Sequence, residues 1–329
     1  MSVASLVDKT ILITGGTGFF GQRFVERLIK ESGAKKIIVF SRDEYKQRIM
    51  QAQMTDPRLR FFIGDVRDKD RLTRAFFGVE MVVHAAALKQ VPALEYNPFE
   101  AVATNILGTQ NVINAAIDCG VEKLVFISTD KAVNPVNTYG ATKMCAERLV
   151  ISGNAYSAGR TKLSVVRYGN VVGSRGSILD IIAEQKKTGV VTLTHEEMTR
   201  FWITHDQGID LVFLALSSMV GGETFIPKIP SMKIVDVINA IAPNCVRKII
   251  GIRPGEKIHE VLITEEEARH GVEFEKYYLL FPLYDWWKNQ DFIGGRKLPE
   301  NFRYASDSNT EWLTADGLLR IVGVHSCGI

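Results

Sequence analysis

The chain has 329 residues, of which 46% are hydrophobic and 23% charged, a composition typical of folded domains and unlike that of disordered proteins. Lys and Arg number 40 against 37 Asp and Glu, and a net charge of +3 is too balanced for a protein that binds nucleic acid through a basic patch. No apolar run approaches the ~20 residues that cross a bilayer, and the first residues lack the pattern of a signal peptide. We therefore expect a cytoplasmic protein of about two domains, with no membrane or nucleic-acid partner.

The cysteines and histidines suggest neither disulfides nor a metal site. Cysteines 119, 145, 245 and 327 lie far apart and form no Cys-x-x-Cys pair, so we expect reduced thiols. His195 is followed by no second histidine at the spacing of a zinc-binding helix, and no metal is expected.

Short β-rich segments alternate with longer helix-like segments in the first half of the chain. The predicted strands are residues 10–14, 36–40, 60–63, 81–84, 123–127 and 163–167. The predicted helices include residues 22–31, 105–119 and 139–152. Because strands that alternate with helices form βαβ units, we predict an α/β fold with a Rossmann-type, doubly wound parallel sheet.

A glycine-rich turn directly follows the first predicted strand and opens the first predicted helix. Glycines at this spacing let the backbone approach a pyrophosphate, and the helix start offers free N–H groups. We predict a dinucleotide site here, with a plain loop as the alternative. Its contacts are expected from Gly15, Thr17, Gly18, Phe19, Phe20 and Gly21.

The end of the second predicted strand bears on which dinucleotide binds. NAD-type sites place an acidic residue about 20 residues after the last glycine to hold the ribose hydroxyls. Here that position is Ser41, followed by Arg42, Asp43 and, one turn on, Lys46. A hydroxyl and two cations suit a 2′-phosphate, so we favour NADP. Asp43 keeps NAD as an alternative, and Arg42 with Lys46 could instead be a solvated face.

Later segments extend the predicted cofactor site. Asp65 and Val66 end the third strand and fit the adenine edge, while the small Ala85 and Ala86 follow the fourth strand, where the backbone passes close to the cofactor. Lys89 is expected to reach both the cofactor and a substrate diphosphate.

Tyr139 and Lys143 stand four residues apart on a predicted helix and therefore share one face. A phenol has a reference pKa of ~10 and needs a nearby cation to act as a base at neutral pH. We predict that Lys143 supplies this cation and also holds the nicotinamide ribose. The alternative for such a pair is an ordinary surface contact.

These features together resemble the extended short-chain dehydrogenase/reductase family. The resemblance is carried by the glycine-rich turn, Asp65, residues 84–87, Asn105, Tyr139 and Lys143. It implies that residues 1–167 form a Rossmann domain that binds the cofactor, with Asn105 and Val171 among its contacts. Residues 168–329 would form a smaller α/β domain that binds a nucleotide sugar, with segments crossing between the two.

The sequence Thr129-Asp130-Lys131, after the fifth predicted strand, sharpens the resemblance. Nucleotide-sugar 4,6-dehydratases carry Thr-Asp-Glu there, and the Lys form is similar to the UDP-N-acetylglucosamine 4,6-dehydratases. Asp130 would then be the acid and Lys131 the base. If neutral, Lys131 would have a pKa lowered by burial and by nearby Lys143 and Lys89. The alternative for Asp130 and Lys131 is an ion pair in a loop.

The group with the greatest similarity is the inverting dehydratases that begin pseudaminic acid biosynthesis for flagellin and surface glycans. Further stretches that resemble them are residues 41–44, 87–89, 167–176, 198–202 and 252–257. Membrane-anchored retaining relatives carry an added transmembrane region and tend to have Met in place of the active-site Tyr, and this chain has neither. Phe19 is a departure, because its equivalent in these relatives can be smaller. The resemblance implies a homo-oligomer, either a dimer or a hexamer.

The substrate is expected to be UDP-N-acetylglucosamine. Arg253 suits a bidentate grip on phosphate and Glu256 suits ribose hydroxyls, with an ordinary charged turn as the alternative. Thr194 is assigned by resemblance only. The residues expected to bind the nucleotide sugar are Lys89, Lys131, Asn170, Arg175, Thr194, Arg253 and Glu256.

Three other functions share parts of this pattern. A C4 epimerase would use Tyr139, Lys143 and the cofactor, but it needs no acid/base pair to eliminate water. A C5-retaining dehydratase would differ in the face that is reprotonated. A regulator that senses NADP would use the same fold without catalysis, and intact Thr129, Tyr139 and Lys143 argue against it.

Overall fold

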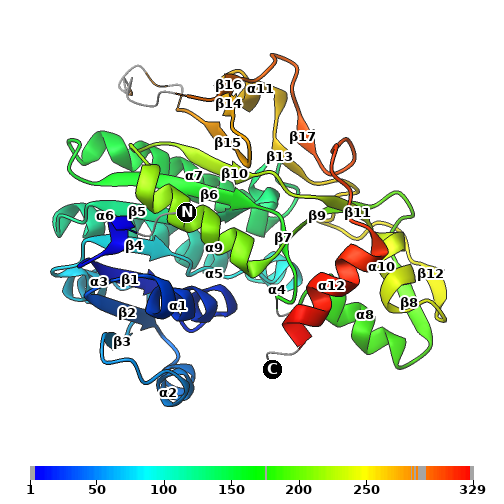
Figure 1. The fold of residues 1–329 in the computed structure, drawn as a ribbon, viewed down its shortest axis with the longest axis horizontal. Helices are drawn as coiled ribbons and strands as arrows, with labels where there is room; N and C mark the ends of the chain where they lie inside the picture. Colours follow the sequence, from blue (N-terminus) through cyan, green and yellow to red (C-terminus); the bar gives the residue numbers. More distant parts are fainter. Residues whose placement is uncertain (1–3, 175, 283, 285–286, 288–293, 327–329) are drawn as a thin grey trace.

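A large twisted sheet organises the molecule (Figure 1). The computed structural model describes residues 4–174, 176–282, 284, 287 and 294–326. In spatial order the strands of this sheet are β16 (Arg296–Lys297), β14 (Gly271–Glu273), β15 (Tyr277–Leu280), β10 (Thr224–Pro227), β6 (Lys162–Tyr168), β5 (Lys123–Thr129), β4 (Met81–His84), β1 (Thr10–Thr14), β2 (Lys36–Ser41) and β3 (Leu59–Ile63).

The strands from β3 to β10 run parallel, which confirms the predicted doubly wound α/β fold. The sheet then continues with β15, β14 and β16, which pair antiparallel. The strand order reverses between β1 and β4, the position where ligands bind in such sheets.

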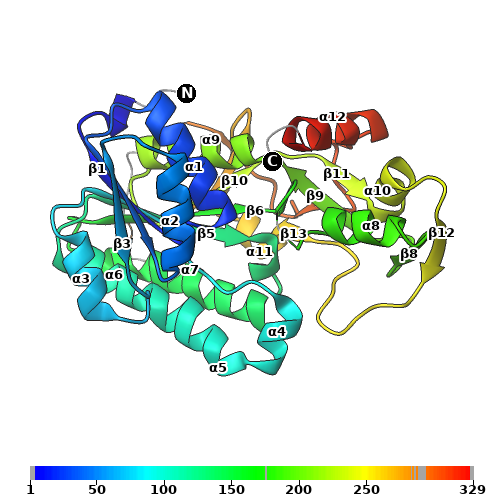
Figure 2. The ribbon, with the colours of Figure 1, turned by 90° about the horizontal axis from the view of Figure 1, so that it is seen from below.

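Helices cover both faces of the sheet, as Figure 2 shows. On one face lie α1 (Phe19–Glu31) and α9 (His205–Ser218), and on the other α3 (Lys69–Phe76), α6 (Gly108–Asp118) and α7 (Thr138–Tyr156). Each face has its own buried core, which contains Phe24 and Leu28 under α1, and Phe76 and Val112 under α3 and α6. Remaining helical elements here are η1 (Ala4–Leu6), α2 (Glu44–Gln53), α4 (Val91–Tyr96), α5 (Pro98–Ala101), η2 (Val102–Leu107) and η3 (Asp130–Ala132).

A smaller part of the chain lies beside the carboxyl ends of the parallel strands (Figures 1 and 2). It contains β7 (Asn170–Val171), β8 (Val190–Leu193), β9 (Thr199–Ile203), β11 (Ser231–Lys233), β12 (Val246–Ile249), β13 (Val261–Ile263), β17 (Tyr304–Ala305), α8 (Ile178–Lys186), α10 (Ile234–Ile241) and α12 (Ala315–Ser326). The short helix α11 (Glu265–Ala268) packs beside β14 of the large sheet instead. Its core packs Leu179, Trp202, Val237 and Leu318 together. Although α9, β10 and β15 follow residue 168, they pack on or join the large sheet.

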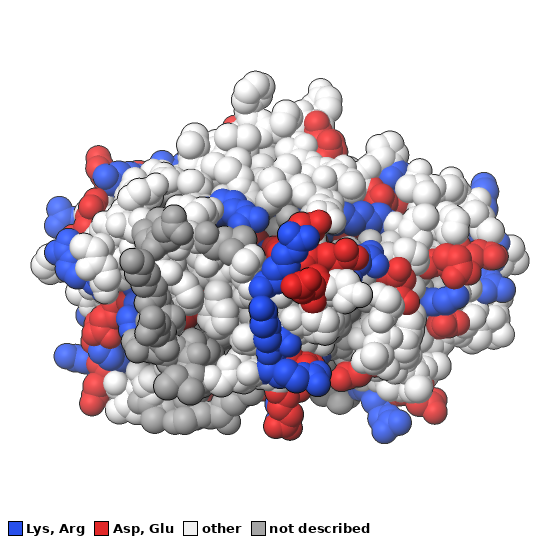
Figure 3. Space-filling view, turned by 90° about the horizontal axis from the view of Figure 1, so that it is seen from above, with Lys and Arg blue, Asp and Glu red and all other residues white. Residues whose placement is uncertain are grey.

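Two observations describe the surface. None of the helices in the described ranges combines the length and the apolar character that a bilayer span requires. On the face in Figure 3, Lys and Arg side chains lie among Asp and Glu side chains.

A cluster of ion pairs joins α7 and α11 to β6 of the sheet. The guanidinium of Arg167 on β6 donates to both carboxylate oxygens of Glu147 on α7, at 3.0 and 2.7 Å, and to those of Glu267 on α11, at 3.0 and 2.9 Å. It also donates to the Leu262 carbonyl, at 2.8 Å. Arg167 therefore fixes the junction of β6, α7 and α11.

Replacing Arg167 with methionine is expected to lower the free energy of unfolding by about 3–5 kcal/mol, because the buried Glu147 carboxylate and the partly buried Glu267 carboxylate lose their counter-ion. Urea unfolding would measure the change. The control is Arg296→Met, whose ion pair with Glu273 is exposed and should cost about 0–1 kcal/mol. Equal losses for the two variants would contradict this role of Arg167.

Candidate active site

A cleft of about 980 Å³ opens where the carboxyl ends of β1, β4, β5 and β6 face the smaller part of the chain. The sheet side contributes the glycine-rich turn and the residues that follow β4 and β5. The opposite side contributes residues of β7, β9 and the turn at 253–257. Sequence segments that are far apart therefore meet in one cleft, at the position typical for a ligand of this fold.

The glycine-rich turn has the shape that a dinucleotide phosphate needs. Gly15 has φ +67°, and a Cβ there would lie 2.9 Å from the Ala86 backbone. A Cβ on Gly21 would lie 2.5 Å from Gly16 Cα, so larger residues would disrupt the packing of α1 on the turn. Gly18 precedes α1 and offers no side chain as a cap, which leaves the N–H groups of the helix start available to an anion. The turn residues that line the cleft are Gly15, Gly18, Phe19, Phe20 and Gly21.

Two aromatic residues of the turn have different surroundings. Phe19 is partly exposed and contacts His205 edge-on, with 4.0 Å between ring centroids. Phe20 stacks on Phe24 and anchors the start of α1 in the core. Thr17 is buried, and its carbonyl accepts a hydrogen bond from the Gln22 amide.

The residues predicted to hold a 2′-phosphate lie together beyond the end of β2. The buried Ser41 hydroxyl accepts a hydrogen bond from Gln47, at 3.0 Å. Arg42 is more than half exposed, and its guanidinium lies 3.8 Å from Asp65. Asp43 caps α2 by accepting from the Lys46 backbone N–H, at 3.0 Å, and forms an ion pair with the Lys46 amine, also at 3.0 Å. These contacts make Arg42 the more accessible cation for an incoming phosphate.

Asn105 supports the cofactor side of the cleft from behind. Its amide accepts from the Leu88 N–H at 2.8 Å, donates to the Leu88 carbonyl at 2.9 Å, and donates to the Thr142 hydroxyl at 3.0 Å. It is 1% exposed, so it holds the loop after β4 against α7.

Of the other predicted cofactor residues, some line the cleft and others lie outside its lining. Ala85, Lys89 and Val171 line the cleft. The backbone of Ala86 contacts Gly15, while Val66 is buried against α6 at Gly108. Asp65 pairs with Arg67, at 2.8 Å, and with Arg42.

Tyr139 and Lys143 both line the cleft, but the expected effect of Lys143 on the phenol is wrong. Burial raises the pKa of Tyr139 to about 12, and Lys131 and a hydrogen bond with Thr129 act against this increase. Burial lowers the pKa of Lys143 to about 7. The Lys143 amine donates to the Ile127 carbonyl at 2.7 Å and lies 3.8 Å from the centroid of the Phe126 ring. The cation that lowers the Tyr139 pKa in this structure is therefore Lys131.

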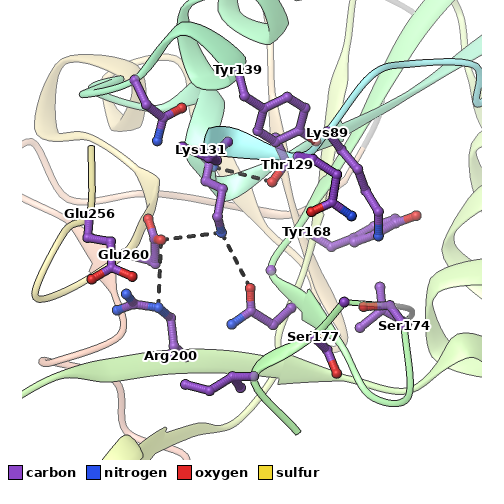
Figure 4. A pocket seen from close by; sticks show the side chains of 18 of the residues that line it. Lys89, Thr129, Lys131, Tyr139, Tyr168, Ser174, Ser177, Arg200, Glu256 and Glu260 are labelled. Carbon is purple, nitrogen blue, oxygen red and sulfur yellow. Dashed lines mark hydrogen bonds and ion pairs between the residues drawn. The ribbon is translucent and has the colours of Figure 1, made fainter. Parts of the chain in front are cut away.

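Thr129, Asp130 and Lys131 form a hydrogen-bonded group at the end of β5. Figure 4 shows Thr129 and Lys131 of this group. The Asp130 Oδ1 accepts from the Thr129 hydroxyl and from the Lys131 amine, both at 3.0 Å. Asp130 is fully buried, and its Oδ2 has no hydrogen-bond partner among the described residues. Burial raises the pKa of Asp130, which suits a carboxylic acid that donates a proton.

The prediction of a lowered pKa for Lys131 is wrong. Burial lowers it, but the negative charges of Asp130 and Glu260 outweigh burial and raise the pKa above its usual range. The Lys131 amine lies 3.0 Å from Asp130 and 3.3 Å from Glu260. It also donates to the Asn170 side-chain oxygen, at 3.4 Å. Lys131 is therefore an ammonium ion in this arrangement and must lose a proton before it acts as a base.

Sequence reasoning missed two residues of the site. Glu260 and Arg200 both line the cleft, and the Arg200 guanidinium lies 3.8 Å from Glu260 (Figure 4). Arg200 lies on β9, and its guanidinium donates to the Ile258 and Lys257 carbonyls, at 3.0 and 2.9 Å. Arg200 stands in the stretch 198–202, which was part of the resemblance. Glu260 follows Lys131 by 129 residues, and no pattern in the sequence indicated that the two are in contact.

The residues predicted to bind the nucleotide sugar lie mostly on the far wall of the cleft. Asn170, Thr194, Arg253 and Glu256 all line it. The Thr194 hydroxyl donates to Glu256, at 3.2 Å, and the Arg253 guanidinium lies 3.9 Å from the same carboxylate. Arg175 lies outside the described residues. Within the described ranges, no group of His, Cys, Asp and Glu is arranged to hold a metal ion.

Hydrogen bonds connect the turn at Arg253–Lys257 to the segment between η3 and the start of α7. The Asn137 side chain caps α7 by accepting from the Gly140 N–H at 2.7 Å, and it donates to the Gly255 carbonyl at 2.8 Å. The Lys257 amine donates to the Val133 carbonyl. These contacts hold the predicted phosphate-binding turn in register with the start of the helix that carries Tyr139.

Known proteins resemble the chain over nearly its whole length. A family described as polysaccharide biosynthesis protein matches residues 11–282. The chain is 47% identical to the inverting UDP-N-acetylglucosamine 4,6-dehydratase of Campylobacter jejuni serotype O:2, over 95% of this chain and 97% of that protein. It is 43% identical to a UDP-glucose 4-epimerase of Rickettsia conorii, over 83% of this chain and 82% of the epimerase.

Solved structures agree with this placement. The structure of Pen from Bacillus thuringiensis is 36% identical, with a TM-score of 0.88 and 98% of each chain covered. Other structures of this fold are complexes with NAD. The chain therefore belongs to the polysaccharide biosynthesis protein family of extended short-chain dehydrogenases/reductases.

Proposed function

We propose that the chain is a C5-inverting UDP-N-acetylglucosamine 4,6-dehydratase that uses NADP. The observation that carries the proposal is the contact of Asp130 with Lys131, at 3.0 Å, beside Tyr139 in a cofactor cleft. An epimerase has no use for an acid beside a base, because it eliminates no water. The 47% identity to an enzyme of this name supports the substrate and the stereochemical outcome. In this role the chain would begin pseudaminic acid biosynthesis.

The cofactor would be held by the glycine-rich turn, the Arg42 region and Lys143. Two observations support this fit. A Cβ at Gly15 or Gly21 would fill the space at the glycine-rich turn, and the start of α1 has no side-chain cap. When bound, the cofactor would supply reversible hydride transfer, for oxidation at C4 of the sugar and later reduction at C6.

Tyr139 would prepare the substrate by taking the proton of the 4-hydroxyl. Thr129 shares a hydrogen bond with the Tyr139 hydroxyl and orients it. The resulting 4-keto group acidifies the C5–H bond, because the carbanion is delocalised as an enolate. The cleft between the sheet and the smaller part of the chain would exclude water at this stage.

One proton shift converts the observed ion pair into the acid and base that elimination needs. The Lys131 ammonium gives a proton to the Asp130 carboxylate across their 3.0 Å contact. The neutral amine then takes the C5 proton, and the Asp130 acid protonates the 6-hydroxyl, which leaves as water. Both residues return to their starting charges, so the protons balance over the step. Reprotonation of C5 from the opposite face would give inversion.

Incubation with UDP-N-acetylglucosamine in heavy water tests the proposal. We expect a 6-deoxy-4-keto product that carries solvent deuterium at C5, identified by mass spectrometry and NMR. A product epimerised at C4 that retains the 6-hydroxyl would favour the epimerase, for which the 43% identity to a UDP-glucose 4-epimerase is the specific observation. Retained configuration at C5 would favour the retaining dehydratase.

The NADP preference is proposed from the exposed Arg42. Arg42→Ala should weaken NADP binding by about 10-fold or more, because a charge-assisted contact to the 2′-phosphate is lost, and should leave NAD binding unchanged. Calorimetric titration of both cofactors measures this. Arg60→Ala, an exposed arginine on the neighbouring strand β3, is the control. Equal losses for NADP and NAD in Arg42→Ala would contradict the assignment.

Self-association is also proposed. Tyr96, Phe99 and Leu107 on α4, α5 and η2 are 87%, 86% and 55% exposed, an apolar group that a second copy of the chain would cover. Light scattering would give the mass of the assembly. Cys119, Cys145 and Cys245 are unpaired thiols, as is usual in the reducing cytoplasm, where we place the enzyme.

A further inference from the structure

Glu260 is a buried carboxylate fixed directly behind Lys131. It is 2% exposed and immediately precedes β13. Its backbone N–H donates to the Ser306 hydroxyl at 2.9 Å, and its carbonyl accepts from the Ser306 N–H at 2.8 Å. The backbone on both sides of the side chain is therefore held in place, and the carboxylate has a defined position.

Three cations surround this carboxylate. Its Oε1 lies 3.3 Å from the Lys131 amine and 3.8 Å from the Arg200 guanidinium, and its Oε2 lies 3.6 Å from the Lys257 amine (Figure 4). The Oε2 atom has no hydrogen-bond partner in the described part of the chain. Burying a carboxylate is costly unless its charge is paired.

Glu260 does not reach the reacting atoms itself. Glu260 lines the cleft, but its side chain is only 3% exposed, whereas that of Lys131 is 26% exposed, so Lys131 presents far more of its surface to a substrate. None of the steps proposed above uses Glu260. Any effect on elimination must therefore pass through Lys131.

The two carboxylates that contact Lys131 differ in their ability to take its proton. Asp130 has Lys131 as its adjacent cation, and burial raises its pKa. Burial acts in the same direction on Glu260, but Lys131, Arg200 and Lys257 outweigh it and lower the Glu260 pKa. The proton of Lys131 is therefore directed to Asp130, the residue that must become an acid. The charged and titratable groups that face Lys131 are Asp130, Glu260, Arg200, Lys257, Lys89 and Tyr139.

We propose that Glu260 is a positioning residue for elimination: it anchors the Lys131 amine beside the cleft and, as a fixed negative charge, sets the pH above which the Asp130–Lys131 pair loses the proton that elimination needs. The inference rests on the proposed dehydratase function. It adds a second carboxylate, contributed by the turn before β13, to the Asp130–Lys131 pair on the loop after β5.

The test compares C5 deuterium incorporation by the wild-type holoenzyme and Glu260→Gln across pH. Removing an anion beside an amine lowers the pKa of the amine, so the alkaline limb of the pH profile, where the Asp130–Lys131 pair loses its proton and the rate falls, should move by about 1–2 units to lower pH. The maximum rate should fall by about 10-fold or more, because the amine is less well placed. The KM for the nucleotide sugar and the rate of C4 oxidation should stay unchanged.

Two further variants complete the test. Glu260→Asp keeps the charge and should keep the wild-type limb with a reduced maximum rate. Glu273→Gln removes a carboxylate that pairs with Lys228 and Arg296 outside the cleft, and it should leave all readouts unchanged.

If the limb of the pH profile in Glu260→Gln lies at the same pH as in the wild type, the inference is overturned, while the proposed dehydratase function stands. If Glu260→Gln does not fold, a displaced limb in Glu260→Asp would overturn it instead. If the wild-type protein forms no 6-deoxy-4-keto product, the proposed function itself fails.

Discussion

Lys131→Met is expected to slow formation of the 6-deoxy-4-keto product by about 10³-fold or more. A positioned general base contributes about 10²–10⁴-fold, and methionine keeps most of the side-chain length while removing the amine. Incorporation of solvent deuterium at C5 should fall by the same factor, because Lys131 is the group proposed to take that proton. Oxidation at C4 should continue and be visible in a single turnover as reduced cofactor, although more slowly, because Lys131 is the cation that lowers the Tyr139 pKa.

The split between the two half-reactions is the decisive feature of this variant. Lys228→Met is a suitable control, because Lys228 also forms an ion pair, with Glu273 at 2.8 Å, but lies outside the cleft. Thermal unfolding of both variants would show whether loss of the buried cation beside Asp130 and Glu260 affects folding. Wild-type deuterium incorporation in Lys131→Met would assign the C5 proton to another residue.

The parallel part of the fold was predictable because its signals are local. The strand prediction 10–14 coincides with β1, and the prediction 163–167 lies within Lys162–Tyr168 of β6. Buried parallel strands appear in sequence as short apolar runs, and the connecting helices show their own periodicity. The antiparallel strands β14 and β16 were missed, since pieces of two or three residues carry too little pattern.

The site was predictable where a motif places its own residues, and less so where the fold brings distant segments together. Tyr139 and Lys143 share a helix face by spacing, and Asp130 and Lys131 are adjacent. The charge state of Lys131 depends on Glu260, which arrives from the turn before β13. Sequence reasoning counted the nearby lysines and therefore predicted a pKa change of the wrong sign.

Tyr139→Phe is expected to reduce C4 oxidation by about 10³-fold or more, because phenylalanine retains the ring but cannot take the 4-hydroxyl proton. Product formation and deuterium incorporation at C5 should fall together with oxidation, since elimination needs the 4-keto group. This coupled loss distinguishes the variant from Lys131→Met, in which oxidation survives. Rapid mixing with substrate, followed by the absorbance of the reduced cofactor, measures the oxidation step.

The pH dependence of the same step follows from the Tyr139 pKa of about 12, raised by burial. Below that pKa the phenolate fraction rises about tenfold per pH unit, so wild-type oxidation should accelerate with pH up to that pKa. Tyr139→Phe should lack this rise. Tyr156→Phe is the matched control, because Tyr156 ends the same helix α7 and is 70% exposed. Oxidation in Tyr139→Phe at the wild-type rate, with the pH rise intact, would show that another group takes the proton and that the Tyr139–Lys143 spacing serves the cofactor alone.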